Sequence, residues 1–167
     1  MNHRWINSHG GPLIFCSMQA ASGWMGITGS SVKSVKTDYE RACDSFSYLN
    51  VIDSNMSKIL ILGDEPLAST IFHTGHDFTI ARWISCESLM VSEIALNDIP
   101  IGLPEIEKSV SMHIYEDESI IFDSAAVLHE SEDEMRVKIN PGKYEITTEL
   151  FDGGHRFKFL IHRLRME

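Results

Sequence analysis

The sequence predicts an α+β fold in a single domain over residues 1–167, built mainly from antiparallel β-sheet with about two helices. Three observations lead to this expectation. Short apolar runs of strand length, such as residues 59–62, recur between turn residues. Apolar and polar residues alternate through the last third of the chain. Helix signatures mark two segments, which begin near Thr37 and Cys86.

The clearest helix signal follows Thr37. A Thr at the cap with Glu40 three residues later forms a capping box, in which each side chain bonds the backbone N–H of the other residue. We expect this helix to run to about residue 46. A second helix is expected over residues 86–97, where Met90 and Ile94 are four positions apart. In the first helix, which follows Thr37, helical spacing places Tyr39, Ala42, Cys43 and Phe46 on one apolar face.

Strand-like segments are separated by turn residues along the rest of the chain. In the last third, the alternation predicts an antiparallel meander with one solvent-facing side, and residues 152–154 (DGG) predict a hairpin. Phe157, Phe159 and Ile161 are expected to face the core on the returning strand. The expected strands are residues 5–6, 13–15, 48–52, 58–62, 68–72, 78–84, 110–114, 120–122, 137–139, 144–150 and 157–161.

The net charge of −10 is unevenly distributed. Residues 37–135 hold 20 acidic and 4 basic residues. A region of this sign repels phosphate backbones, so we expect no direct contact with nucleic acid. Such acidity is typical of a soluble protein, and it also suits a basic partner.

The three cysteines, Cys16, Cys43 and Cys86, are widely spaced and form no C-x-x-C motif. We therefore expect reduced, buried thiols and neither a disulfide nor a zinc site. No apolar run approaches the roughly 18 residues of a membrane span. The first 13 residues contain no apolar stretch of signal-peptide type, so we expect no membrane association and a cytoplasmic protein.

Two clusters suggest catalytic or metal chemistry. His73, His76 and Asp77 include two metal-ligating rings and a carboxylate, yet they surround a glycine in a turn between strands, and a solvated hairpin turn is the interpretation we favour. Asp64 and Glu65 follow a buried strand and can serve as an acid–base pair, although Gly and Pro beside them favour a plain turn or a turn offered to a partner. Nothing assembles a nucleophile, a base and an oxyanion site, so we predict no enzyme, no cofactor and no metal.

The acidic stretch between Glu116 and Glu134 has a different character. It holds eight acids and no Lys or Arg. Acids at loop tips keep sheet edges from pairing, which is a structural role. They can also imitate phosphates and occupy the cleft of a basic enzyme, because complementary charge raises the association rate and selects the partner.

Several strings, taken in order, resemble one family. These are Trp5-Ile6 followed by Ser8 and Gly10-Gly11-Pro12-Leu13-Ile14, Trp24 with Gly26, Thr37-Asp38-Tyr39-Glu40-Arg41-Ala42-Cys43, Leu62-Gly63-Asp64-Glu65-Pro66-Leu67, Arg82-Trp83, and Phe122-Asp123-Ser124-Ala125. Together they resemble immunity protein 21, a family of bacterial polymorphic toxin systems, over residues 5 to about 125.

The resemblance implies an immunity protein that binds and neutralises a cognate toxin domain in the cytoplasm of the producing cell. A nuclease or another nucleic-acid-directed toxin suits the charge best, and an ADP-ribosyltransferase or deaminase toxin also fits. Other functions stay open: a small hydrolase or metal-dependent enzyme that uses His73, His76 and Asp77, or a non-catalytic regulatory scaffold. The expected toxin contacts are Asp64, Glu65, Glu116, Asp117, Glu118, Glu132, Asp133 and Glu134.

Overall fold

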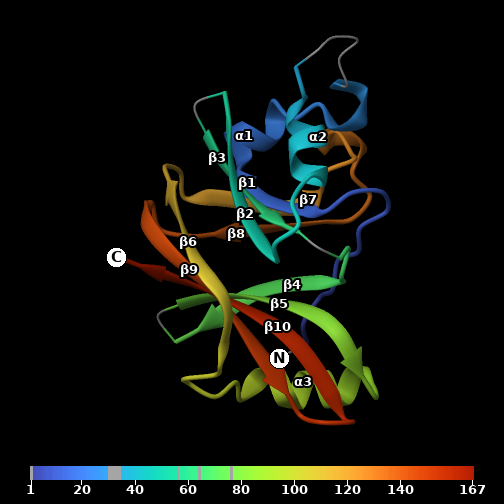
Figure 1. The fold of residues 1–167 in the computed structure, drawn as a ribbon, viewed down its shortest axis with the longest axis vertical. Coiled ribbons are helices and arrows are strands. Elements are labelled where there is room, and N and C mark those ends of the chain that lie inside the picture. Colours follow the sequence, from blue (N-terminus) through green and yellow to red (C-terminus); the bar gives the residue numbers. More distant parts are fainter. Residues whose placement is uncertain (1, 30–34, 56, 64, 76) are drawn as a thin grey trace.

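The computed structural model describes residues 2–29, 35–55, 57–63, 65–75 and 77–167 (Figure 1). Two five-stranded antiparallel sheets make up its centre. Sheet I has the order β2-β3-β1-β7-β8 and lies in the upper half of Figure 1, with α1 and α2 beside it. Sheet II has the order β4-β5-β10-β9-β6 and lies in the lower half with α3. The predicted α+β class, dominated by antiparallel sheet, is confirmed.

The elements follow the chain in this order: β1 (Leu13–Ser17), α1 (Met18–Ser22), the 3₁₀ turn η1 (Gly26–Gly29), α2 (Asp38–Cys43), β2 (Leu49–Ser54), β3 (Ser57–Leu62), β4 (Ser69–Thr74), β5 (Asp77–Cys86), α3 (Leu89–Asn97), β6 (Glu105–Ile114), β7 (Glu118–Asp123), the 3₁₀ turn η2 (Leu128–Glu130), β8 (Glu134–Lys138), β9 (Gly142–Asp152) and β10 (Phe157–Met166). Residues 5–6 form no strand; Ile6 makes an isolated bridge to Ser69 in β4.

The strands of the last third do not form the expected meander. β7 and β8 join sheet I, where β7 pairs with β1, whereas β6, β9 and β10 belong to sheet II. The meander prediction was wrong because alternation fixes which side chains share a face but not which sheet a strand joins. The hairpin at residues 152–154 is confirmed by the pairing of β9 with β10.

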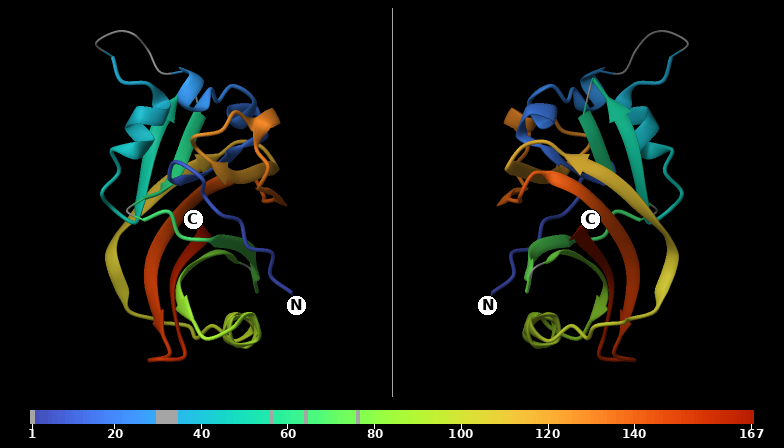
Figure 2. Two further views of the ribbon diagram at one scale, coloured as in Figure 1. Left: turned by 90° about the vertical axis from the view of Figure 1, so that its right-hand side faces the viewer. Right: turned by 90° about the vertical axis from the view of Figure 1, so that its left-hand side faces the viewer.

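Side chains pack on both faces of each sheet over much of its area, so the predicted solvent-facing side is wrong for β10 and for the second half of β9. At the start of β9, Lys143 and Glu145 do face solvent. One core lies between the sheets and contains Phe15, Leu60 and Ile146. A second lies between sheet I and the helices α1 and α2. A third contains Phe159 and lies on the side of sheet II that carries α3 and the N-terminal segment, around which the strands curve in Figure 2. Burial on two faces explains why both Phe159 and its neighbour Leu160 are buried.

Helix α2 confirms the capping box. The Thr37 hydroxyl accepts from the Glu40 N–H at 3.3 Å, and the Glu40 carboxylate accepts from the Thr37 N–H at 2.7 Å. The helix ends at Cys43 rather than near residue 46. Phe46 therefore lies beyond it and is 89% exposed, and Cys43 is exposed as well, so the prediction was wrong for these two residues. The other two residues of the predicted apolar face, Tyr39 and Ala42, do pack against the core.

Helix α3 begins at Leu89, three residues later than expected, and the side with Met90 and Ile94 faces solvent. Ser92, Ala95 and Leu96 are the buried residues, whereas Met90 and Ile94 are exposed. Helix α1 was not expected, because five residues carry little periodicity. Within the described part of the chain, no helix is long and apolar enough to span a bilayer.

Candidate functional site

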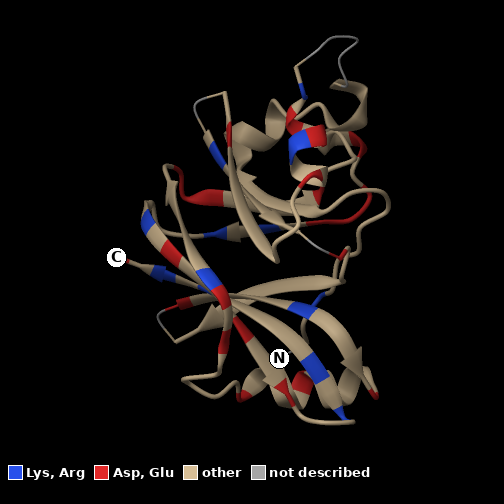
Figure 3. Cartoon of the chain, viewed as in Figure 1, with Lys and Arg blue, Asp and Glu red and all other residues tan. Residues whose placement is uncertain are grey.

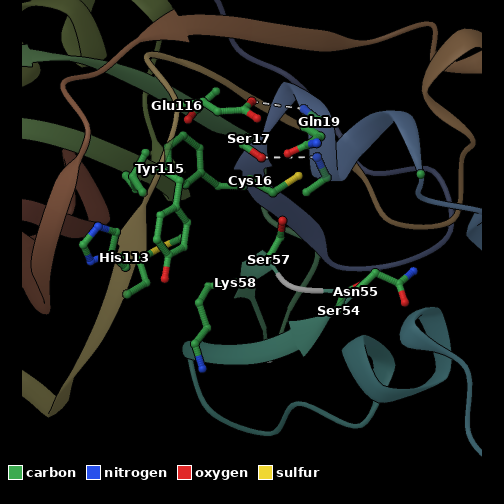
Figure 4. Close-up of a pocket in the computed structure, with 16 residues that line it drawn as sticks. Cys16, Ser17, Gln19, Ser54, Asn55, Ser57, Lys58, His113, Tyr115 and Glu116 are labelled. Carbon is green, nitrogen blue, oxygen red and sulfur yellow. Dashed lines mark hydrogen bonds between the residues drawn. The ribbon is translucent and has the colours of Figure 1, made fainter.

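A cleft opens where β1 and β3 separate. The ladder between these strands ends at the pair Phe15–Leu60. Beyond it, β1 continues to Ser17 alongside β7, and β3 starts at Ser57 alongside β2. The space between the separated strands has a volume of about 260 Å³, and α1 and the end of β6 also line it (Figure 4).

The wall supplied by β6 carries an aromatic pair. Met112 and Ile114 are buried, so alternation along the strand turns His113 outward, and Tyr115 follows on the same side. The rings of His113 and Tyr115 are stacked, with centroids 4.3 Å apart and planes inclined by 27°. Tyr115 is 64% exposed, and Figure 4 shows both residues across the cleft from Asn55. Exposed tyrosine is among the residues that contribute most to protein interfaces.

The acidic run 116–118 lies at the mouth of this cleft. The Glu116 carboxylate accepts from the Gln19 N–H in α1 at 3.3 Å. One residue later, the carbonyl oxygen of Asp117 accepts from the Ile139 N–H at 2.9 Å. Both contacts hold the loop in place, while Asp117 and Glu118 are exposed. The loop therefore presents its negative charge from a fixed backbone.

The deeper lining of the cleft combines polar groups with an inert thiol. Ser119 is fully buried, and its hydroxyl has no hydrogen-bond partner among the described residues. Burial, and to a lesser extent the charge of Glu116, raises the pKa of the Cys16 thiol to about 12, so the thiol stays protonated. The Lys58 ammonium is ion-paired with Asp53 at 2.6 Å.

The structure does not bring the two predicted acidic clusters together. In the β7–β8 ladder, Glu118 pairs with Lys138, whereas Glu134 pairs with Phe122 at the opposite end. The runs 116–118 and 132–134 therefore lie at opposite ends of this strand pair. Figure 3 likewise shows acidic residues distributed over loops in both halves of the molecule.

The second cluster has structural partners of its own. Asp133 accepts from the Asn7 N–H at 2.8 Å and forms an ion pair with Arg4 at 3.3 Å, which holds the N-terminal segment. Glu134 lies 2.8 Å from the Nε of Arg136. Glu132 is exposed.

The turn that follows β3 is organised by a buried arginine. Arg82 in β5 is 1% exposed and donates to the carbonyl oxygens of Gly63, at 2.8 Å, and Glu65. Glu65 itself is exposed, and Asp64 lies outside the described residues. The backbone of this turn therefore has a structural role that joins the two sheets.

The histidine-containing turn connects β4 and β5. The His73 ring packs against Phe78 with centroids 3.8 Å apart, and Asp77 forms an ion pair with Arg165 at 3.4 Å. His76 lies outside the described residues. In the part of the chain that the structure describes, no group of three or more His, Cys, Asp or Glu residues is placed to hold a metal ion.

Sequence reasoning missed three contributors to the cleft, His113, Tyr115 and Ser119. An aromatic residue directly before an acidic run was a usable signal for Tyr115. Ser119 carried none, because its role depends on β1 and β3 separating. The exposure of Met90 and Ile94 on α3 was also missed, because their spacing indicates a helix but not which of its sides is buried.

The fold and the site define a two-sheet antiparallel β-domain with a small acidic cleft edged by aromatic rings. The chain belongs to the family Immunity protein 21, whose family model matches residues 4–156. The resemblance noted for residues 5 to about 125 is thereby confirmed, and the match continues through β9 to the turn before β10. The family carries an immunity role with a toxin as the class of partner. No curated protein and no solved structure matches the chain.

Proposed function

We propose that the protein binds a cognate bacterial toxin domain in a stoichiometric complex and neutralises it, which protects the producing cell. Membership of the Immunity protein 21 family supports this role. The net charge of −10 favours a basic partner, such as a toxin domain that acts on nucleic acid. The encounter takes place in the cytoplasm, and the protein contributes binding rather than a catalytic step.

The observation that carries the proposal is the position of Tyr115 beside the acidic run 116–118. An exposed tyrosine supplies apolar contact area at a small cost in conformational entropy and keeps a polar tip. The acids increase the rate of encounter with a positively charged surface. Because the loop backbone is already fixed at Glu116 and Asp117, binding orders little additional chain.

The other acidic residues have graded roles in the proposal. Asp64, Glu65 and Glu132 act as peripheral contacts that strengthen the negative field. Asp133 and Glu134 contribute charge while they keep their bonds to Asn7 and Arg136. A toxin domain that covers the cleft contacts the run 116–118 directly. The run 132–134 then lies at the margin of the interface.

Co-expression with the toxin encoded by the neighbouring gene tests the function. We expect growth to be restored and the two proteins to co-purify in a fixed ratio. If the neighbouring product kills cells alone, and this protein neither rescues them nor binds it, the immunity role is rejected.

A matched pair of variants tests the surface. Tyr115, directly after β6, is 64% exposed. Ile94, on α3, is exposed to nearly the same extent, at 63%. Tyr115→Ala is expected to weaken the complex by more than tenfold, in line with hot-spot residues that contribute about 2 kcal/mol or more. Ile94→Ala is expected to leave it unchanged. The reverse result places the interface on α3 and rejects the cleft.

A further inference from the structure

We propose that the cleft between β1 and β3 receives an arginine side chain of the toxin. This inference rests on the proposed function and adds the chemical class of the group that the site recognises. A guanidinium is a planar cation that stacks on aromatic rings and donates several hydrogen bonds to carboxylates and hydroxyls. Tyr115, Glu116 and Ser119 line the cleft and supply one group for each of these interactions.

The cleft is a built feature of sheet I. β1 is held by β7 as far as Ser17, and β3 is held by β2 as far as Ser57, yet the two strands stop pairing with each other at Phe15–Leu60. Since each strand is fixed by its outer neighbour, the separation is stable. The volume of about 260 Å³ lies at the lower end of the roughly 300 to 1,000 Å³ of small-molecule sites and is enough for one side chain.

The hydroxyl of Ser119 gives an independent indication that a polar group enters. Ser119 lies on the same face of β7 as Ile121, which belongs to the core between the sheets. Ser119 is among the residues that line the cleft, its side chain is fully buried, and its oxygen has no hydrogen-bond partner among the described residues. A buried hydroxyl without a partner is unfavourable, and a donor from an entering side chain relieves this.

The charges around the cleft favour a cation over an anion. Glu116 lines the mouth, and Asp117 and Glu118 follow it on the exposed loop. Lys58 is the cation in the described lining, and its ammonium is ion-paired with Asp53 at 2.6 Å. Figure 4 shows the Lys58 side chain directed away from Glu116. An arginine that enters from the mouth therefore meets a net negative field.

Two conservative variants test the cleft in the toxin complex. Glu116→Gln removes the charge and keeps an oxygen for the Gln19 N–H, and Ser119→Ala removes the unpaired hydroxyl. Each is expected to raise the Kd of the complex about tenfold, as for a hydrogen bond to a charged group. Ser119→Ala should not lower the Tm of the free protein, because the hydroxyl has no partner there. Glu87→Gln, on an exposed carboxylate near the start of α3, is the matched control and should have no effect.

A double-mutant cycle identifies the entering residue. Glu116→Gln and Ser119→Ala are each combined with an alanine scan of the toxin domain surface. We expect one toxin arginine to couple to both Glu116 and Ser119, by about tenfold in Kd beyond additivity. A tight complex in which both variants bind like the wild type, or in which the coupled residue is not an arginine, overturns the inference and leaves the proposed function standing.

The cleft can also be tested without the toxin. The wild-type protein is titrated with N-acetylarginine amide, with N-acetylnorleucine amide as the control, and backbone amide shifts are followed by NMR. Shifts at Ser119 and Tyr115 that occur with the arginine probe alone support the cleft even if the toxin does not bind, in which case the proposed function fails by itself. No shift at these amides, together with no toxin binding, overturns both proposals.

Discussion

The Arg82 guanidinium in β5 donates a hydrogen bond of 2.8 Å to the carbonyl oxygen of Gly63, directly after β3. This contact joins sheet II to sheet I at a point where both groups are buried. The same side chain also donates to the carbonyl oxygen of Tyr48 at 3.2 Å, before β2. One buried cation therefore satisfies backbone acceptors from two loops of sheet I, which makes it a tie between the sheets.

Replacing Arg82 is expected to destabilise the folded protein. Arg82→Met keeps most of the apolar stem but removes the hydrogen bonds from a charged donor to the carbonyl oxygens of Tyr48, Gly63 and Glu65, so we expect a loss of about 3 kcal/mol or more in the free energy of unfolding. Urea denaturation gives the value. Arg156→Met, at an exposed position in the β9–β10 turn, is the control and should change stability little. Equal stability of the two variants contradicts the structural role of Arg82.

Stability is expected to depend on the protonation of His162. Burial, followed by the charge of Arg82, holds the pKa of His162 well below its ordinary value. The unfolded chain therefore takes up a proton near pH 6.5 while the folded protein does not. The contribution of His162 to the free energy of unfolding is therefore fully present above about pH 6.5. As the pH falls toward the folded pKa, the free energy of unfolding decreases by up to about 1.4 kcal/mol per pH unit.

The variant His162→Gln tests this dependence. Glutamine cannot titrate and can still bond the Thr148 hydroxyl, which lies 3.1 Å from Nδ1 of His162. We expect a shallower loss of stability between pH 6.5 and 5 in urea titrations. Part of the slope remains, because burial also lowers the pKa of His3. An unchanged slope in the variant shows that His162 is not the group responsible.

Glu107 connects β6 to the start of β2. Its carboxylate accepts from the N–H of Leu49 at 2.8 Å, from the N–H of Tyr48 at 3.1 Å and from the Thr148 hydroxyl at 2.9 Å. We expect Glu107→Ala to lower the free energy of unfolding by about 2 kcal/mol. Glu105→Ala, at an exposed position of the same strand, should stay close to the wild type. Calorimetric melting of the two variants provides the comparison.

Gly26 is required by both conformation and space. Its φ is +53°, and an added Cβ would lie 2.4 Å from the carbonyl oxygen of Ala125. Gly154 has a similar φ of +70° but an open surrounding, with no atom within 4 Å of such a Cβ. Gly154→Ala is thus expected to cost about 1 kcal/mol and Gly26→Ala about 3 kcal/mol in chemical denaturation. Similar losses for both would mean that the contact with Ala125 carries no penalty.

The acidic run at the cleft mouth is expected to control the rate of toxin binding. Reversing Asp117 and Glu118 to lysine should slow association about tenfold at low salt and reduce its salt dependence. Glu132→Lys tests the second cluster without disturbing Asp133, which holds Asn7. Stopped-flow association with the toxin domain at several salt concentrations measures both. If neither change affects the rate, the acidic loops serve solubility alone.

Local signals predicted local structure well. The capping box of Thr37 and Glu40 and the β9–β10 hairpin depend on residues close in sequence, so both could be recognised there. The errors at Cys43, Phe46 and Met90 have a common cause. A short helix carries too few residues for periodicity to define which side is buried, and the neighbouring sheet decides it.

The sequence also indicated part of the candidate site. It identified the acidic run 116–118 and the class of partner, because charge density and ordered strings are properties of the chain. It did not indicate Ser119, whose place in the cleft depends on where the β1–β3 ladder ends. Nor did it separate Asp133 from Glu132, since an intramolecular partner 126 positions away is not visible locally.

By itself, the sequence determined the fold class, most of the strands and the strong negative charge. Alternation and turn residues are local features, and composition is a sum over the chain. Only the tertiary structure decided that β7 and β8 belong to sheet I while β6, β9 and β10 belong to sheet II. It also decided that Arg82 connects the two sheets and that β1 and β3 separate to form a cleft. These features arise from contacts between residues far apart in the chain, whose energies depend on the packing of both sheets together.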